Sequence, residues 1–470
     1  MLSEPLKKIL IFLMLGLLTA SAFFIRLENF NNSTKRSIDE IVYYRMAKQI
    51  LEEGPSGYNT IPYGREMAAS DRPLPDYFFQ PLFKHPPLFT LLISFSMKIF
   101  GVKLVSAEYI PLLLGVLFIP ATYLLGRLLF DFKIAICSAL FMWIDPVSIM
   151  TSQKVWMDTT LSFLMLMGVL FFVIGLKFDK SSFFIWSGLA CGLATLTKYT
   201  GIFATVNIGL FAFAYRRELF RNRSFIIGLI LPFALLLPWF YANYLVYGGG
   251  FLFKQKSLHL NEHLYLVFFI LFLSLGILKG LSIYLRRFFV MEDDQQKLEK
   301  GVLTRKRIDM VLGITLAIVV FKHIILSLNF NHLPRTSWAG AVLRDSLFTF
   351  YVTQLLEYSF VYFFAFASFF IERKERLVEI SLLRYGALIV LIFFSIWKYF
   401  QCRYILFAIP LLVILAFELI FMIYEKIEKI DGFLPRLFLK SALLFPIIYG
   451  LGRTVMIDLL LSFPNDMCYF

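Results

Sequence analysis

Long apolar runs separated by short polar stretches recur along almost the whole chain. A helix needs about 20 mostly apolar residues to cross the hydrocarbon core of a membrane, where its backbone groups can bond only within the helix. The pattern therefore predicts an all-α, polytopic membrane protein with about thirteen transmembrane helices. We place these helices at residues 6–25, 107–129, 134–150, 159–176, 183–196, 202–214, 225–247, 264–284, 308–328, 347–371, 382–397, 404–424 and 437–461.

Two polar stretches interrupt this pattern. In the first, residues 27–105, apolar side chains of residues 38–52 recur at helical spacing, which indicates an amphipathic helix on the membrane surface. The apolar run 86–100 within the same stretch has about fifteen residues, which is short for a span, so we interpret it as an interfacial or re-entrant helix. The second stretch, residues 291–307, carries mixed charge and few apolar residues, which is typical of a solvated cytoplasmic linker.

The basic residues indicate the orientation of the chain. The formal net charge is +14, and cytoplasmic loops of membrane proteins are rich in Lys and Arg. With the N-terminus inside, nearly every basic cluster lies in an inner loop, including Arg305-Lys306-Arg307, and residues 27–105 lie outside. A membrane-crossing 86–100 helix would reverse this arrangement downstream. The positive charge therefore indicates a bilayer rather than nucleic acid as partner.

Composition excludes a soluble domain, because 59% of the residues are hydrophobic and 55 are phenylalanine. We interpret residues 1–470 as a single transmembrane domain without a separate C-terminal soluble domain, and the first apolar run as a retained anchor. The four cysteines form neither a CxxC pair nor a metal motif.

Acidic and basic residues gather on the outer face. Asp39 and Glu40 begin the predicted surface helix and Asp158 begins a span, where a carboxylate also complements the helix dipole by about 0.3 to 1 kcal/mol. Lys198 and Arg403 stand at the outer ends of apolar stretches. Both would suit a phosphate, and the alternative is that they extend to the lipid headgroups.

Three histidines are further candidates for binding a substrate or a metal ion. His259 and His263 are four residues apart, so on a helix they share a face and could bind a divalent cation together with a carboxylate. The alternative is a pair of surface histidines. His85 closes the long outer loop just before Pro86-Pro87.

Several short motifs occur together along the chain. In chain order they are Ile38-Asp39-Glu40, His85-Pro86-Pro87-Leu88, Trp156-Met157-Asp158-Thr159-Thr160, Thr197-Lys198-Tyr199-Thr200-Gly201, Pro238-Trp239 and Arg403-Tyr404. Their order resembles that of the GT-C glycosyltransferases, and most closely the group with protein O-mannosyltransferases and lipid A aminoarabinose transferases. The resemblance covers roughly the first 250 residues, and beyond them only the segment from Arg403 to Pro410.

The resemblance implies an integral membrane transferase that moves a sugar from a polyprenyl-phosphate donor to an acceptor on the outer face. It places Asp39 and Glu40 at the catalytic centre together with Asp158, and Lys198 and Arg403 near the donor phosphate. Some relatives carry a histidine near the position of His259 or His263. The acceptor class, whether lipid, glycan or protein, stays open, because this chain lacks the soluble domains of both related groups.

General chemistry is compatible with this assignment. Cations stabilise a departing phosphate, a carboxylate can act as base toward an acceptor hydroxyl, and in an inverting displacement the two act on opposite faces of the sugar. We predict Asp39 as the base of a glycosyltransferase in the cell (inner) membrane, with its site on the periplasmic or extracytoplasmic side. A divalent metal ion is the one cofactor left open. The alternative function is a transporter or flippase of lipid-linked sugars, but such proteins keep ionisable residues near the bilayer midplane.

Overall fold

The computed structural model describes residues 4–28, 37–68, 76–248, 351, 355–356, 358–371, 377–396 and 401–460 of the 470-residue chain. Every regular element in these ranges is an α-helix or a 3₁₀-helix. The predicted all-α class is therefore confirmed. The predicted spans 264–284 and 308–328 and the predicted linker 291–307 lie outside the described residues, so the predicted total of about thirteen spans stays a prediction.

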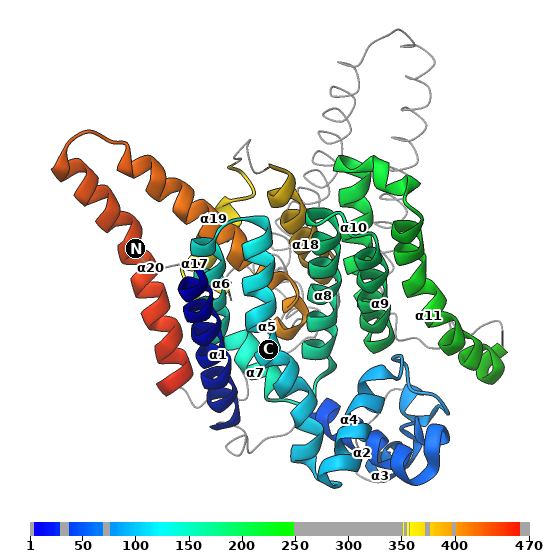
Figure 1. Ribbon diagram of the computed structural model, residues 1–470. Helices are drawn as coiled ribbons and strands as arrows, with labels where there is room; N and C mark the ends of the chain where they lie inside the picture. Colours follow the sequence, from blue (N-terminus) through cyan, green and yellow to red (C-terminus); the bar gives the residue numbers. More distant parts are fainter. Residues whose placement is uncertain are drawn as a thin grey trace, which may run out of the picture.

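Six helices among the described residues are long and apolar enough to cross a membrane. They are, or lie within, α1 (Glu4–Glu28), α5 (Leu104–Leu129), α8 (Met157–Lys177), α11 (Arg223–Tyr247), α19 (Ala408–Glu428) and α20 (Phe433–Leu460). Three further helices occupy predicted spans: α9 (Ser182–Thr197), α10 (Ile202–Tyr215) and α18 (Leu377–Ile396). The molecule is thus an integral membrane protein whose apolar runs form a helical bundle (Figure 1).

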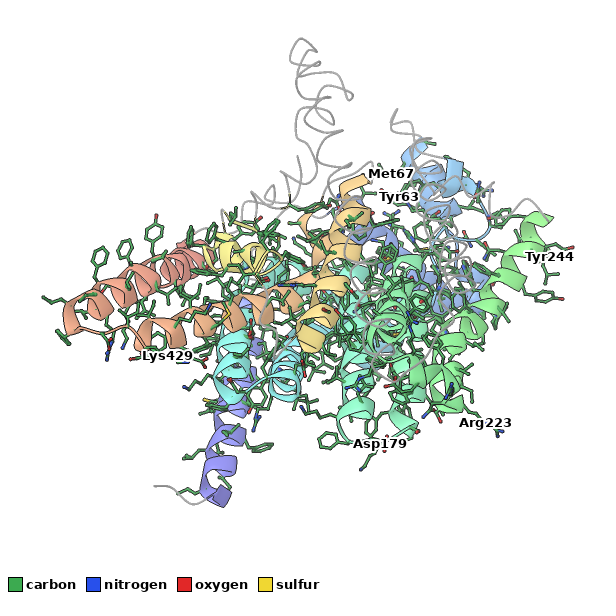
Figure 2. All side chains as sticks on the ribbon, turned by 90° about the horizontal axis from the view of Figure 1, so that it is seen from above. Tyr63, Met67, Asp179, Arg223, Tyr244 and Lys429 are labelled. Atoms are coloured by element: carbon green, nitrogen blue, oxygen red, sulfur yellow. The ribbon has the colours of Figure 1, made fainter. Side chains whose placement is uncertain are left out.

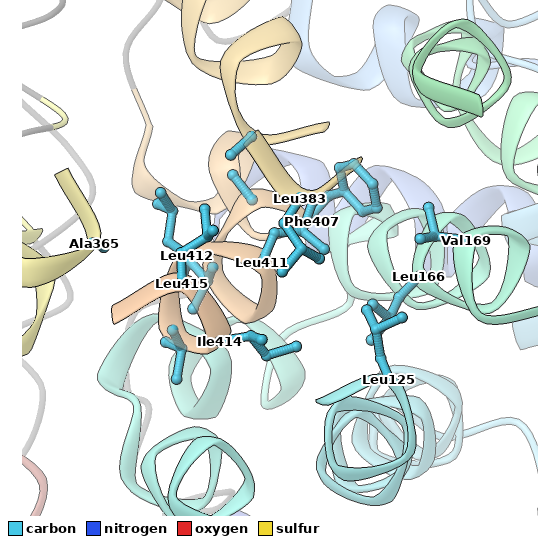
Figure 3. Close-up of a cluster of buried hydrophobic side chains, with 14 of the residues drawn as sticks. Leu125, Leu166, Val169, Ala365, Leu383, Phe407, Leu411, Leu412, Ile414 and Leu415 are labelled. Carbon is cyan, nitrogen blue, oxygen red and sulfur yellow. The ribbon is translucent and has the colours of Figure 1, made fainter. Parts of the chain in front are cut away.

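The core of the bundle surrounds α19. This helix packs against α6 (Phe132–Ile144), α17 (Val361–Ala367) and α18, while α5, α8, α9 and α11 continue the bundle on the other side. Figure 3 shows Leu411, Leu412 and Leu415 of α19 among apolar side chains from neighbouring helices. Two glycines bring α9 and α11 together, because a Cβ on Gly188 would lie 2.1 Å from the carbonyl oxygen of Gly228.

Two predicted spans are interrupted in the structure: 347–371 is non-helical at Ser359 and Phe360, directly before α17, and 134–150 is bent. Residues 134–150 were expected to form one helix, but α6 ends at Ile144 and α7 (Pro146–Ser152) continues at an angle of 54°. The break has a local cause, since Pro146 has no backbone N–H and occupies the first turn of α7. Asp145 caps that turn by accepting a hydrogen bond from the Ser148 backbone N–H at 2.7 Å.

Helices α2 (Ile38–Glu53), α3 (Ile61–Ala68) and α4 (Leu88–Phe100) lie together at one end of the bundle (Figure 1). They share a small apolar core that includes Met46, Phe89, Ile93 and Trp239. At 13 residues α4 is about 20 Å long, well below the roughly 30 Å of a hydrocarbon core. Its place beside α2 and α3 agrees with the interpretation of residues 86–100 as a helix that does not cross the membrane.

Large apolar and aromatic side chains cover the outside of the bundle. On α11, Leu237, Tyr241 and Leu245 are each more than 60% exposed, and Tyr244 points away from the neighbouring helices (Figure 2). In a soluble protein such a surface would be a liability. Around a membrane bundle it is the surface that meets lipid.

Candidate active site

Five of the eight predicted site residues lie together where the α2–α4 group meets the bundle. Asp39 and Glu40 lie in the first turn of α2, Asp158 in the first turn of α8, and Lys198 at the C-terminal cap of α9. Arg403 lies in a 3₁₀-helix, η7 (Cys402–Ile405), that precedes α19. Acids at helix N-termini and a cation at a C-terminus are the favourable arrangement for the helix dipoles.

Arg403 is the centre of a chain of ion pairs. Its Nη2 lies 2.6 Å from Oδ2 of Asp39 and its Nε lies 3.5 Å from Oδ2 of Asp158. The other oxygen of Asp158, Oδ1, lies 2.9 Å from Nζ of Lys198. The Arg403 and Asp158 side chains are only 5% and 3% exposed, whereas that of Asp39 is 50% exposed. Of the two carboxylates paired with Arg403, Asp39 is therefore the one that an incoming molecule can reach.

Aromatic rings form a wall behind the two cations. The guanidinium carbon of Arg403 lies 4.2 Å from the ring centroid of Trp156, and Nζ of Lys198 lies 4.5 Å from that of Tyr404. Each such contact stabilises a cation by about 0.5 to 2 kcal/mol, more when water is excluded. The wall therefore helps to keep both positive charges in place.

Glu40 faces inward, unlike its neighbour Asp39. Its carboxylate accepts hydrogen bonds from the Ser37 backbone N–H at 3.0 Å and from the Ser37 hydroxyl at 3.2 Å, which completes a capping box at the start of α2. It also accepts from the Val155 N–H at 3.4 Å and lies 4.0 Å from Nζ of Lys154. With its side chain 1% exposed, Glu40 is part of the support of α2.

A residue without a predicted role, Lys84, adds a third cation to the site. Its charge acts on Asp39, Lys198 and Arg403. Burial, opposed by the charge of Asp39 and assisted by those of Lys198 and Arg403, lowers the pKa of Lys84 to about 8. Three cations, Lys84, Lys198 and Arg403, thus face two carboxylates, Asp39 and Asp158. The available sequence signal was the position of Lys84 directly before the His85-Pro86-Pro87 motif.

This excess of positive charge fixes the ionisation of the neighbouring groups. Partial removal from water acts to raise the pKa of Asp39, but the ion pair and hydrogen bond with Arg403 and the charges of Lys84 and Lys198 lower it below its ordinary value of 3.8. Burial and the same three cations hold the pKa of His85 well below 6.5. At neutral pH Asp39 is therefore ionised and His85 is neutral.

The structure shows no metal site in the part of the chain that it describes, since no group of three His, Cys, Asp or Glu side chains there could hold an ion. The oxygens of Asp39 and Asp158 face a guanidinium and an ammonium group, which is not a metal-binding arrangement. His259 and His263 lie outside the described residues. His85 lies beside the ring of Phe83, with a centroid distance of 5.5 Å.

One family model matches part of the sequence. Residues 84–241 match the family model of dolichyl-phosphate-mannose-protein mannosyltransferase. The matched segment contains Lys84, Asp158 and Lys198, and leaves Asp39 and Arg403 outside. No curated protein matches the chain in a sequence search.

Solved structures extend the similarity to nearly the whole chain. The structure of ArnT from Cupriavidus metallidurans in the apo state matches with a TM-score of 0.52 and 16% identity, over 99% of this chain and 74% of that chain. The same protein bound to undecaprenyl phosphate matches with a TM-score of 0.50 and 16% identity, over 96% and 73%. The Archaeoglobus fulgidus oligosaccharyltransferase in the apo form matches with a TM-score of 0.56 and 16% identity, over 94% and 55%.

These structures share their fold with this chain, which spans about three quarters of ArnT and about half of the oligosaccharyltransferase. The resemblance that the order of the motifs predicted is thereby confirmed. The chain has the fold of the GT-C membrane glycosyltransferases and, over residues 84–241, resembles the protein mannosyltransferases among them.

Proposed function

We propose that this protein is a glycosyltransferase that moves a sugar from a polyprenyl-phosphate donor to an acceptor hydroxyl. The observation that carries the proposal is the pairing of an enclosed, net positive cluster with one solvent-accessible carboxylate. Arg403 and Lys198 are 5% and 15% exposed, and Asp39 beside them is 50% exposed. Such a site suits a reaction in which a phosphate leaves and a hydroxyl loses a proton.

The cations act on the leaving group. As the bond between the sugar and the phosphate breaks, negative charge grows on the phosphate oxygens, and fixed cations stabilise that charge without reorganising. Lys84, Lys198 and Arg403 supply three positive charges. Asp158 holds two of them, since its two oxygens bind Lys198 and Arg403 separately.

Asp39 acts on the acceptor. The carboxylate takes the hydroxyl proton while the acceptor oxygen forms a bond to the anomeric carbon, and the bonding pair leaves with the phosphate on the opposite face of the sugar, which inverts its configuration. The 2.6 Å contact between Asp39 and Arg403 opens when a donor phosphate takes the place of Asp39 on the guanidinium. Donor binding therefore frees the base.

Two findings support the lipid-phosphate donor and the outer-face location. ArnT was crystallised bound to undecaprenyl phosphate, and the archaeal oligosaccharyltransferase AglB was solved with an inhibitory peptide and a dolichol-phosphate. In this chain Cys402, next to Arg403, is disulfide-bonded, and disulfides persist in oxidising compartments outside the cytoplasm. We place the catalytic loop, residues 27–105, on that side of the cell membrane within a single transmembrane domain. The acceptor is a lipid, a glycan or a protein.

The proposal is tested with purified protein and polyprenyl-phosphate sugars labelled in the sugar. We expect release of polyprenyl phosphate only when an acceptor preparation from the cell envelope is added, with the label in the acceptor. A protein that instead moves intact donor between the leaflets of vesicles, without cleavage, is the predicted alternative, a flippase. That result would overturn the proposed function.

A further inference from the structure

Three structural elements meet at the site, and each contacts the other two. Helix α2 meets η7 through Asp39 and Arg403, and α8 meets η7 through Asp158 and Arg403. The third contact, between α2 and α8, is made by an aromatic side chain. The indole N–H of Trp156 donates to the hydroxyl of Ser37 at 2.9 Å, and the face of the same ring carries Arg403.

Both partners in this hydrogen bond occupy helix caps. Ser37 is the N-cap of α2, and its hydroxyl accepts a hydrogen bond from the Glu40 backbone N–H at 3.4 Å. Trp156 is the N-cap residue of α8, and it is 3% exposed. The indole therefore connects the first turns of the two helices that carry Asp39 and Asp158.

We infer that Trp156 is a positioning residue that holds Arg403 and the start of α2 at one fixed separation. The inference rests on the proposed function for the roles of Asp39 and Arg403. Once a phosphate replaces Asp39 on the guanidinium, the direct ion pair no longer sets the place of Asp39. The path from Arg403 through the Trp156 ring and the Ser37 hydroxyl remains, and it keeps the base in reach of the acceptor.

Glu40 strengthens this arrangement without replacing it. Its bond to the Val155 N–H ties α2 to the residue before Trp156, whereas the indole continues the connection to Arg403. Loss of the indole N–H alone should thus loosen α2 by a small distance rather than unfold it. Small displacements of a reacting group are costly, up to about 10²-fold for 1 Å.

The test compares Trp156→Phe, Ser37→Ala and the double variant. Phenylalanine keeps a ring for Arg403 and removes the N–H, so we expect kcat to fall about 10-fold while the KM for the donor changes little. Ser37→Ala also removes the N-cap of α2, so its kcat should fall at least as far, and the double variant should be no worse than Ser37→Ala alone, because Trp156→Phe then has no bond left to remove. Trp143→Phe is the matched control, since the indole N–H of Trp143 has no partner among the described residues.

Amide hydrogen exchange gives a second readout that needs no turnover. Faster exchange at residues 37–44 in Trp156→Phe, which keeps the Ser37 cap, but not in Trp143→Phe, supports positioning of α2 by Trp156. Unchanged exchange, a kcat equal to that of Trp143→Phe, or single effects that multiply in the double variant would overturn the inference. A wild-type protein without turnover would instead count against the proposed function, and the exchange data would still decide on Trp156.

Discussion

Asp39 and Asp158 show how two carboxylates with the same partner can have different tasks. Both lie in the first turn of a helix and both contact Arg403. Asp158 is almost fully enclosed and divides its oxygens between two cations, so it can orient them but cannot meet an acceptor. Asp39 is half exposed and binds one cation. Environment rather than residue type thus selects the candidate base.

The first prediction concerns that choice. Asp39→Asn keeps the size of the side chain and removes the proton acceptor, so transfer should fall by about 10²-fold or more. Donor binding should persist, because Arg403 keeps its contact with Asp158. Turnover and donor affinity of the purified variant provide the measurement, with Glu52→Gln on the exposed side of α2 as control.

Glu40→Gln separates the two neighbours. A glutamine oxygen can still accept the Ser37 hydrogen bonds, so we expect a moderate loss of turnover. If Glu40→Gln abolished transfer and Asp39→Asn left it near normal, the base would be Glu40. Full activity of both variants would remove the catalytic role from this loop.

A second prediction at this scale uses the pKa of Lys84. Its ammonium group is charged below pH 8 and neutral above it, because burial lowers its pKa to about 8. A neutral Lys84 no longer attracts a phosphate, so donor affinity should decline as the pH rises through about 8. Equilibrium binding of a polyprenyl-phosphate donor between pH 6.5 and 9.5 measures the decline.

Lys84→Arg is the informative variant, because a guanidinium stays protonated throughout this range. Its donor affinity should be nearly constant with pH. Equal slopes for the variant and the wild-type protein would assign the pH dependence to another group.

At the scale of elements, the apolar pattern located helices better than their interruptions. The spans expected at 107–129 and 159–176 correspond to α5 and α8 within a few residues, because a long apolar run has few alternatives to a helix in a membrane. The break at Asp145 was missed although Asp145-Pro146 marks it in the sequence. Apolar residues on both sides made the run look continuous, although Asp145 and Pro146 form a hinge between α6 and α7.

At the site, too, the sequence predicted some features and missed others. Sequence reasoning selected Asp39, Glu40, Asp158, Lys198 and Arg403, and the structure brings their elements together. It could not find their pairing, since Asp39 and Arg403 are 364 residues apart and such contacts depend on how helices pack. It also missed Lys84, which directly precedes the candidate His85, and it did not predict that Glu40 faces inward.

The hinge gives a prediction about stability. Asp145 is fully buried, caps α7 and accepts a hydrogen bond from the Tyr362 hydroxyl at 2.6 Å. Asp145→Ala leaves that hydroxyl and the first turn of α7 without their acceptor, which should cost about 2 to 4 kcal/mol. Asp131→Ala, which removes the partly exposed cap of α6, should cost about 1 kcal/mol.

Thermal denaturation in detergent compares the two variants. We expect the Tm of Asp145→Ala to lie clearly below that of Asp131→Ala. Equal Tm values would mean that the hinge network contributes no more than an ordinary helix cap.

At the scale of the whole molecule, the site lies at one end of the bundle and the turn that contains Asp179 at the other. Helix α8 joins the two, since Asp158 lies in its first turn and Asp179 lies two residues beyond its last residue, Lys177. Its 21 residues span about 31 Å, close to the thickness of a hydrocarbon core. We therefore expect the two ends to lie on opposite sides of a membrane.

The topology prediction follows from this distance and from the positive-inside rule. A thiol introduced by Ser56→Cys, in the α2–α4 group, should react with a membrane-impermeant maleimide added to intact cells. A thiol introduced by Asp179→Cys should react only after the membrane is opened, with the unsubstituted protein as background control. The reverse pattern would place the site in the cytoplasm and refute an outer-face reaction.

The contact between Asp39 and Arg403 also has a consequence for biosynthesis. At about 5 to 20 residues per second, a ribosome needs roughly 20 to 70 s to extend the chain over the 364 positions from Asp39 to Arg403. During that time α2 has been made, while the guanidinium that will hold its carboxylate has not. On the proposed function, a chain that stops shortly before Arg403 has most of its helices but lacks this cation, so we expect no turnover until synthesis has passed Arg403.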